Sequence, residues 1–446
     1  MPYGSQELDA ALHLSRLEPR KAGVQYSPRD TDNHSLALKR AGFLFLLTLA
    51  AHSVRGENWP CWRGPRGDGT SLEQKPPTRW SATENIAWKT PIPGEGHSSP
   101  IIWDDRVFVT SALKETQDRI LLSLDRKTGA VLWQQAVVRA PLEAKNKENS
   151  YASATPATDG EKVFVTFLDG EKVVIAAFDF TGKQLWMVRP GDFKSQWGFS
   201  HTPVLFEDKV IVVCYSKGEN FIVAVSRADG HTVWKTACEN PTLSYSPPLI
   251  AKMAGRIQMI AAGDKAVTSY DPQTGKMLWM IDGPSDDFVV APVYHPKADL
   301  VLACSSWPGK MLVAIRPDGQ GNVTSNKVAW KTAQGTPYVP SPIAVGDWFF
   351  TSGFVGKSAH CYEAATGRIL WKEPMGLHHA SPVSANGLLY FLNDEGVMHV
   401  VKAGPKFELV ARNDLGEGAY ASPALSGNQV FLRGFTNLYC IGKQGQ

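Results

Sequence analysis

The chain of 446 residues lacks the familiar signatures of catalysis. It contains no Gly-x-Ser-x-Gly nucleophile elbow, no His-Glu-x-x-His helix, no Gly-x-x-x-x-Gly-Lys-Ser/Thr phosphate loop and no kinase signature set. Asp and Glu are plentiful but stand in turn sequences, where a solvated Asp is expected. We therefore predict no catalytic residues, and we expect a binding protein rather than an enzyme.

Cysteine is scarce and isolated. The six cysteines occur singly, without a Cys-x-x-Cys, an adjacent pair or a Cys/His spacing of zinc type. The sequence therefore predicts no metal site. Disulfide pairing stays open, although Cys214, Cys304 and Cys440 lie in apolar stretches that favour buried thiols.

Neither sign of charge dominates, because 46 Lys and Arg face 43 Asp and Glu, a net charge of +3. A nucleic-acid footprint would need clustered basic residues, so we expect no nucleic-acid partner. Long apolar runs are also missing, apart from residues 41–51, which are too few to span a bilayer. We expect no membrane span and a monomeric protein.

That apolar run follows a basic flank, Leu38-Lys39-Arg40, and small residues follow it. The pattern resembles a secretory signal, so we interpret residues 1–56 as a leader with its signal-like segment at 38–56. The expected location is periplasmic or secreted. Because the run begins well inside the chain, a buried helix of a cytoplasmic protein remains the alternative.

Tryptophan is abundant, with 14 residues, and much of it belongs to a repeat. Five times a Gly stands four residues before a Trp, as in Asp125-x-x-Thr128-Gly129-x-x-x-Trp133. Asp and Thr can bond the local backbone and Gly accepts positive φ, so this stretch predicts a tight turn between two strands.

A second marker precedes each unit: a proline after a small residue, which predicts the first residue of a strand. Seven of the eight preceding residues carry a hydroxyl, and Ala291 is the exception. The steps between prolines are 56, 47, 44, 45, 50, 40 and 41 residues, which fits four-stranded propeller blades. The prolines are Pro100, Pro156, Pro203, Pro247, Pro292, Pro342, Pro382 and Pro423.

The predicted fold is all-β: an eight-bladed β-propeller of four-stranded antiparallel blades over residues 85–446. The chain ends near 437–441, a third-strand sequence, whereas 85–90 is a fourth-strand sequence without a preceding blade. We predict that this N-terminal strand closes the last blade; an unrelated leader strand is the alternative. Blade seven has no Trp at the usual position, which we assign to 407–410, and the polar stretch 143–149 is expected to loop out.

Residues 57–84 are rich in turn formers and are predicted to form an extended cover. In one interpretation Trp59 and Trp62 anchor this cover on the propeller. In the other, Arg63 and Arg66 face an anionic ligand. We favour the structural interpretation.

The segments just before each proline marker are enriched in aromatic residues and histidine. Because loops from every blade are expected to converge at one end of the channel, this mouth is the default ligand site. The same side chains could instead fill the channel. The candidates are His97, Tyr151, Trp197, His201, Tyr245, Tyr338, His378, His379 and Tyr420, with Phe288 in the fifth linker.

The Ala/Leu-x-Asp-x-x-Thr-Gly-x-x-x-Trp repeat resembles the tryptophan-docking motif of the PQQ-like β-propellers, over residues 85–441. That resemblance implies that the tryptophan of each repeat packs between neighbouring blades. The residues concerned are Trp88, Trp133, Trp186, Trp234, Trp279, Trp330 and Trp371.

The resemblance implies two branches. Quinoprotein dehydrogenases bind pyrroloquinoline quinone (PQQ) with calcium or a lanthanide in the channel, whereas BamB-like assembly factors are non-enzymatic scaffolds. The chain lacks the adjacent Cys-Cys pair of the first and the Leu-x-x-Cys anchor of the second. We expect a non-enzymatic, exported BamB-like scaffold without a cofactor, for a protein or glycan partner. A PQQ-dependent dehydrogenase with calcium is the alternative.

Overall fold

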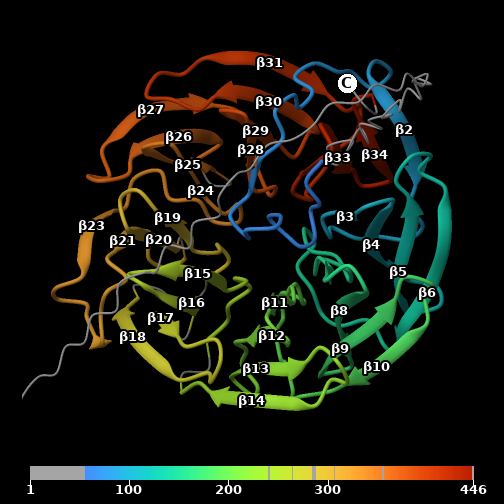
Figure 1. The fold of residues 1–446 in the computed structure, drawn as a ribbon, viewed down its shortest axis with the longest axis horizontal. Helices are drawn as coiled ribbons and strands as arrows, with labels where there is room; N and C mark the ends of the chain where they lie inside the picture. The colour runs from blue at the N-terminus through green and yellow to red at the C-terminus, as the bar shows by residue number, and fades with distance from the viewer. Residues whose placement is uncertain are drawn as a thin grey trace, which may run out of the picture. The chain divides into compact units, whose positions relative to one another are not determined.

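A computed structural model describes residues 56–239, 242–263, 265–283, 288–305, 307–353 and 356–443. The predicted leader lies outside these residues, except for Gly56. The described residues form eight antiparallel blades around one axis (Figure 1), which confirms the predicted propeller. The described residues contain strands and no helix. Among them, no helix is therefore long and apolar enough to cross a membrane.

The first four blades each take their four strands in chain order, from the channel outward. Their strands are β3 (Ile101–Trp103), β4 (Arg106–Leu113), β5 (Asp118–Asp125), β6 (Val131–Arg139), β7 (Ala157–Thr158), β8 (Lys162–Asp169), β9 (Lys172–Asp179), β10 (Gln184–Val188), β11 (Val204–Phe206), β12 (Lys209–Cys214), β13 (Phe221–Ser226), β14 (Thr232–Ala237), β15 (Leu249–Met253), β16 (Arg256–Gly263), β17 (Ala266–Tyr270) and β18 (Met277–Asp282).

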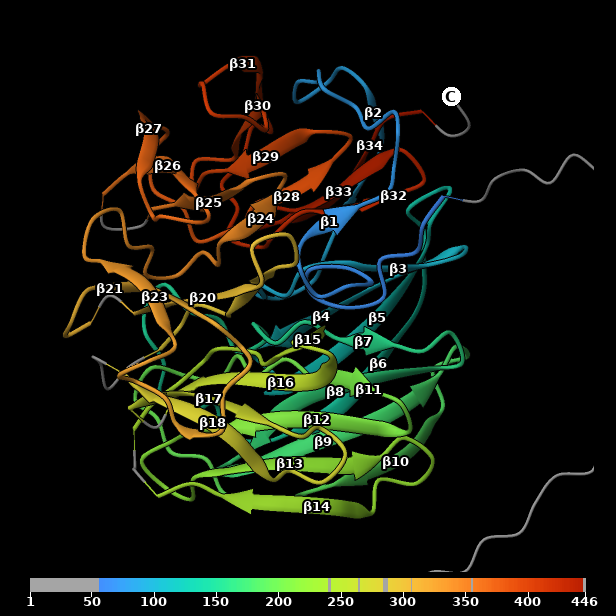
Figure 2. The ribbon, with the colours of Figure 1, turned by 60° about the vertical axis from the view of Figure 1, so that its left-hand side comes forward.

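The next three blades follow the same order. Their strands are β19 (Val293–His295), β20 (Leu300–Ser305), β21 (Met311–Ile315), β23 (Val328–Thr332), β24 (Ile343–Val345), β25 (Trp348–Ser352), β26 (Ser358–Glu363), β27 (Ile369–Pro374), β28 (Val383–Ala385), β29 (Leu388–Leu392), β30 (Val397–Lys402) and β31 (Leu409–Asp414). Two short strands pair in parallel with blade edges. β22 (Gly321–Asn322) pairs with β18, and β1 (Thr70–Ser71) pairs with β28, as Figure 2 shows for the second pair.

The last blade joins both ends of the propeller. It consists of β32 (Ala424–Ser426), β33 (Gln429–Arg433), β34 (Asn437–Ile441) and, as its outer strand, β2 (Ile86–Pro91). Lys89 pairs with Tyr439 and Pro91 with Asn437 in an antiparallel ladder. The predicted closure is therefore confirmed, and it removes two sheet edges that would otherwise be open.

The middle strands of each blade are buried on both faces. All residues of β12 and β13 are buried, whereas β14, the outer strand of the same blade, is mostly exposed or half-buried. A middle strand lies between two neighbouring blades, so both of its faces must be apolar. This explains why these stretches read as continuous Val, Ile and Ala runs rather than as alternating patterns.

Each repeat tryptophan donates an indole N–H hydrogen bond to a backbone carbonyl in the turn of the following blade. The donor and acceptor pairs are Trp88 and Arg126 (2.8 Å), Trp133 and Phe180 (2.9 Å), Trp186 and Arg227 (3.2 Å), Trp234 and Pro272 (3.2 Å), Trp279 and Pro317 (3.1 Å), Trp330 and Ala364 (2.8 Å), and Trp371 and Gly404 (3.0 Å). These bonds cross seven of the eight blade seams.

The seam between blades seven and eight is different. The assignment of 407–410 to the tryptophan position is wrong: Ala411 pairs with Val400 in the register that Trp371 has with Cys361. Phe407 instead packs edge-on against Trp371, with ring centroids 5.4 Å apart. The predicted position was shifted because the turn before β31 is one residue longer than in blade six: the Lys402 N–H donates to the Glu408 carbonyl, whereas the Glu363 N–H donates to the Arg368 carbonyl.

Residues from the 57–84 segment fill that seam. Trp80 is buried in the same apolar cluster as Ala411, and its backbone N–H donates to Asn413 Oδ1 at 3.0 Å. The Asn413 side-chain amide donates in turn to the Thr78 carbonyl at 3.0 Å. A tryptophan from outside the repeats therefore lies where blade seven has only an alanine.

Candidate functional site

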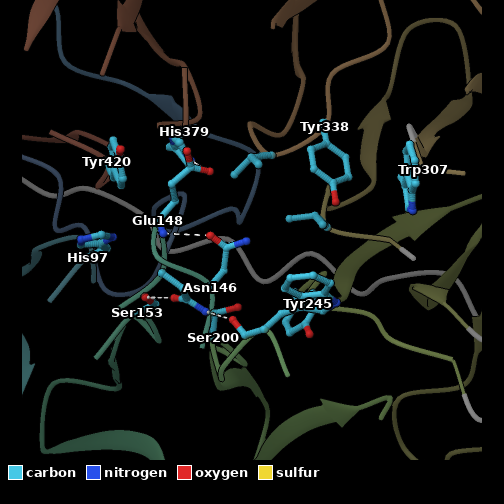
Figure 3. A pocket seen from close by; sticks show the side chains of 14 residues that line it. His97, Asn146, Glu148, Ser153, Ser200, Tyr245, Trp307, Tyr338, His379 and Tyr420 are labelled. Carbon is cyan, nitrogen blue, oxygen red and sulfur yellow. Dashed lines mark hydrogen bonds and ion pairs between the residues drawn. The ribbon is translucent and has the colours of Figure 1, made fainter. Parts of the chain in front are cut away.

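A cavity of about 440 Å³ opens at the end of the channel where the innermost strands begin. All eight linkers that precede an innermost strand contribute to its lining, together with Trp307 from the β20–β21 linker. The remaining lining residues are His97, Asn146, Glu148, Asn149, Ser153, Trp197, Ser200, Tyr245, Val289, Tyr338, Val339, His379 and Tyr420 (Figure 3). The volume lies within the range of small-molecule sites, roughly 300–1,000 Å³.

The structure brings six of the nine sequence candidates together around this cavity. In Figure 3, His97, His379 and Tyr420 lie on one side, and Tyr338 and Trp307 on the other, with Asn146 between them. The six candidates in the lining are His97, Trp197, Tyr245, Tyr338, His379 and Tyr420.

Three candidates lie outside the cavity lining. The His201 ring is buried beside Phe193 and Phe199, and its Nε2 lies 2.7 Å from the Ser244 carbonyl. The buried His378 holds its Nδ1 3.0 Å from the Gly376 carbonyl. Tyr151 is half-buried under the Lys145 ammonium, which lies 5.0 Å from its ring centroid. His201 thus joins two neighbouring linkers, whereas His378 and Tyr151 contact residues of their own linkers.

Sequence reasoning passed over the polar part of the lining. Asn146, Glu148 and Asn149 belong to the stretch expected to loop out, yet they turn toward the channel axis. Their only sequence signal is position, since they precede the second proline marker after the longest step. Trp307 carries no such signal, because it lies in the linker between β20 and β21 and not in a segment that precedes a proline marker.

The loop of Asn146 and Asn149 holds the backbone of Trp197. The Asn149 side-chain amide donates to the Trp197 carbonyl at 2.8 Å, and the Asn146 backbone N–H donates to the same oxygen at 3.2 Å. On the other side, the Trp197 N–H donates to Ser195 Oγ at 2.9 Å. Ser195 Oγ also bonds the Tyr245 hydroxyl. These contacts fix the Trp197 backbone between two blades.

A second network centres on His379. Its Nδ1 lies 2.9 Å from Asp394 Oδ2, and its backbone N–H donates to the other carboxylate oxygen at 2.8 Å. Its ring stacks on Tyr420 with centroids 3.9 Å apart and planes 21° apart, while Nε2 lies 4.0 Å from Glu148 Oε2. Two carboxylates and a stacked phenol thus fix the imidazole orientation.

His97 meets the edge of Tyr420, with ring centroids 4.9 Å apart. Burial, helped by the nearby Arg433, His379 and Lys145, lowers the pKa of His97 to about 3. Its imidazole is therefore neutral near pH 7 and adds no positive charge to the cavity. Burial also raises the pKa of Tyr420, assisted by Asp394 and Glu148, so the phenol keeps its proton.

The opposite end of the channel is covered by residues 57–72. Arg63 is 3% exposed and donates to the Pro342 carbonyl at 2.6 Å, the Ser341 carbonyl at 3.3 Å and the Asp68 carbonyl at 2.7 Å. A smaller space of about 310 Å³ remains between this segment and the innermost strands of blades two to five. Arg63 thus binds backbone carbonyls of blade six.

The cavity lining does not match PQQ with calcium. Of the described residues that line it, none is Lys or Arg, although the carboxylates of PQQ call for cationic partners. Glu148 is the one carboxylate among the described lining residues. Calcium takes about six to eight oxygen ligands. Over the described residues no cluster of three or more His, Cys, Asp or Glu side chains is placed to hold a metal ion.

Comparison with known proteins relates the chain to one family. The family described as outer membrane protein assembly factor BamB matches residues 78–176 and 170–406. BamB of Yersinia pestis is 20% identical over 343 residues, which are 73% of this chain and 80% of BamB. The solved structure of BamB from Moraxella catarrhalis superposes with a TM-score of 0.56 at 15% identity, over 80% of this chain and 99% of that one.

A dehydrogenase also matches. The polyvinylalcohol dehydrogenase of a Pseudomonas species is 25% identical over 244 residues, which are 51% of this chain. The matched part spans 35% of the length of that dehydrogenase. The solved structure of Moraxella catarrhalis BamB, at 15% identity, shows that the fold is shared and nothing more.

Proposed function

Since the chain belongs to the family described as outer membrane protein assembly factor BamB, we propose that it is a non-enzymatic binding scaffold. Its partner is a protein or a glycan, and its site is the channel-mouth cavity. The signal-like segment at 38–56 supports export to the periplasm or beyond the cell. N-terminal sequencing of the exported protein tests that location: a start near residue 54 or 57 supports it.

The observation that carries this proposal is the convergence of all eight linkers on one cavity with a mixed lining. Aromatic rings and polar side chains share the lining, and the rim is formed by residues far apart in the chain. Loops on a rigid scaffold are the usual place for binding residues.

A PQQ-dependent dehydrogenase is the second candidate. It is favoured by the 25% identity to polyvinylalcohol dehydrogenase, a higher value than the 20% identity to BamB. The lining argues for the scaffold, because it gives the cofactor carboxylates no cationic side chain.

Reconstitution with PQQ and calcium separates these candidates. We expect no change in the Trp fluorescence titration and no dye-linked oxidation of primary or secondary alcohols. Saturable cofactor binding together with alcohol oxidation would establish the dehydrogenase instead. Lanthanide chloride serves as a parallel metal arm.

A further inference from the structure

Trp197 is a large apolar side chain that the fold leaves exposed. Its exposed fraction is 40%, whereas Trp59 and Trp279 are fully buried and Trp88, Trp186 and Trp371 are each at least nine-tenths buried. A single exposed apolar side chain is ordinary by itself, so its position in the molecule decides what it can do. Trp197 also lines the channel-mouth cavity, where a ligand would lie.

The backbone beneath this exposed ring is held in place. Two hydrogen bonds reach the Trp197 carbonyl from the 146–149 loop, and Ser195 accepts from its N–H. The next residue, Gly198, has φ +94°, and a Cβ there would lie 2.6 Å from Asn149 Nδ2. The loops therefore fit together only with glycine at 198. A backbone held in place before the ligand arrives loses little entropy on binding.

Polar groups beside the ring are free to meet hydroxyl groups. The Glu148 carboxylate has His379 Nε2 at 4.0 Å as its contact, and its side chain is 37% exposed. Asn146 uses its side-chain oxygen to accept from the Glu148 N–H at 2.9 Å, which leaves its NH₂ group toward the cavity. Carboxylate and amide together accept from and donate to neighbouring hydroxyls.

We propose that this cavity binds an uncharged oligosaccharide, with the Trp197 indole as the stacking surface and Glu148 and Asn146 as hydroxyl partners. The inference rests on the proposed binding function and names its ligand class. Sugar rings have an apolar face that stacks on an aromatic ring and a rim of hydroxyls that both donate and accept. Charged saccharides are disfavoured, because no lining side chain is Lys or Arg and Glu148 repels anions.

A peptide ligand fits the geometry less well. Extended peptides bind by adding to a sheet edge through main-chain hydrogen bonds. The cavity lies before the innermost strands start, and its described lining comes from linkers and not from a strand edge.

Isothermal titration of the full chain with cellotriose, maltotriose and chitotriose tests the inference, with trigalacturonate as an acidic comparison and a β-strand peptide as a protein comparison. We expect saturable binding of at least one neutral sugar. Trp197→Ala should weaken that binding by about tenfold or more, since central aromatic contacts dominate affinity. Trp197→Phe, which keeps a ring, should retain most of it.

Leu409→Ala is the matched control, because Leu409 is 49% exposed on the outer strand β31 and far from the channel. It should bind like the unaltered chain. The inference is overturned if no neutral sugar binds, if the peptide or trigalacturonate binds more tightly, or if a folded Trp197→Ala protein binds normally. Failure of the sugar titrations leaves the scaffold proposal standing, whereas PQQ-dependent alcohol oxidation would remove that proposal itself.

Discussion

The backbone N–H of Ser341 donates a 2.9 Å hydrogen bond to the hydroxyl of Ser381, the residue at the same place in the next blade. Both residues directly precede a proline marker, and both are buried. The same bond runs from Ser381 to Ser422 at 3.0 Å and from Ala291 to Ser341 at 2.9 Å. The hydroxyl-proline marker is therefore an inter-blade contact around the channel.

Blade five shows what happens without the hydroxyl. Ala291 stands at the marker position there, so it offers no acceptor to the preceding blade. The Ser246 N–H donates instead to Ser244 Oγ within its own blade, at 3.2 Å. A buried backbone N–H must find a partner, and the chain supplies a local one where the ring of hydroxyls is interrupted.

Replacing Ser381 with Ala should lower the free energy of unfolding by about 1–3 kcal/mol, because the buried Ser341 N–H then has no acceptor. Urea denaturation followed by far-UV circular dichroism measures the change. Ser381→Thr retains the hydroxyl and should lose much less. Equal stability of the Ala and Thr variants would show that the bond contributes nothing.

Gly367 and Trp330 form a pair across the seam between blades five and six. The indole N–H of Trp330 reaches the Ala364 carbonyl, and a Cβ built on Gly367 would lie 2.5 Å from the ring. Gly367→Ala should therefore destabilise the fold in two ways: the side chain clashes with the indole, and the backbone angle φ +73° is unfavourable for alanine. Together these effects should lower the free energy of unfolding by about 1–3 kcal/mol.

The control for Gly367→Ala is Gly387→Ala. Gly387 has a similar φ, +71°, but nothing lies within 4 Å of an added Cβ. It should show the backbone cost alone, on the order of 1 kcal/mol. Equal changes in melting temperature for the two variants would mean that the Trp330 indole can move aside without loss of stability, and that it does not stabilise the contact between blades five and six.

How much of this molecule could be predicted follows from which features repeat. The hydroxyl residue before the proline, as at Ser341, recurs in seven of the eight blades, and the tight turn of Gly129 recurs in five, so these local patterns predict the propeller and its number of blades. The register of Ala411 was not predictable, because the turn before β31 is one residue longer than in blade six, and residues 402–408 lack the Thr-Gly pair that marks the turn in other blades. Linkers have no period, so the inward turn of Asn146 toward the cavity was equally invisible.

Two truncations test closure by the N-terminal strand. Removing residues 1–84 deletes the segment that fills the last seam but keeps β2, whereas removing residues 1–91 also deletes the ladder from Ile86 to Pro91. The longer deletion should lower the free energy of unfolding by roughly several kcal/mol more than the shorter one, because it exposes the edge of β34 and the apolar side of the last blade. Calorimetry should show a broader and less cooperative transition. Coincident melting curves for the two deletions would contradict the role of the closing strand.

Stability should fall in mild acid because of buried imidazoles. Burial lowers the pKa of His201 to about 4, although the bond to the Ser244 carbonyl opposes the shift. The unfolded chain, with an ordinary value near 6.5, then binds a proton that the folded chain excludes. The free energy of unfolding is therefore unaffected by His201 above about pH 6.5 and decreases by about 1.4 kcal/mol for each pH unit between 6.5 and 4.

The variant His201→Phe isolates this contribution, because the aromatic cluster of Phe193 and Phe199 can hold a phenyl ring of similar shape. It loses the bond to the Ser244 carbonyl at every pH, so its stability near pH 7 should be lower by about 1 kcal/mol. Between pH 6.5 and 4 its free energy of unfolding should nevertheless fall less steeply with pH, by the slope that corresponds to the uptake of about one proton. Urea midpoints at half-unit intervals measure both slopes. Parallel slopes would show that His201 is already protonated in the folded chain, which requires that water or a carboxylate reaches its ring.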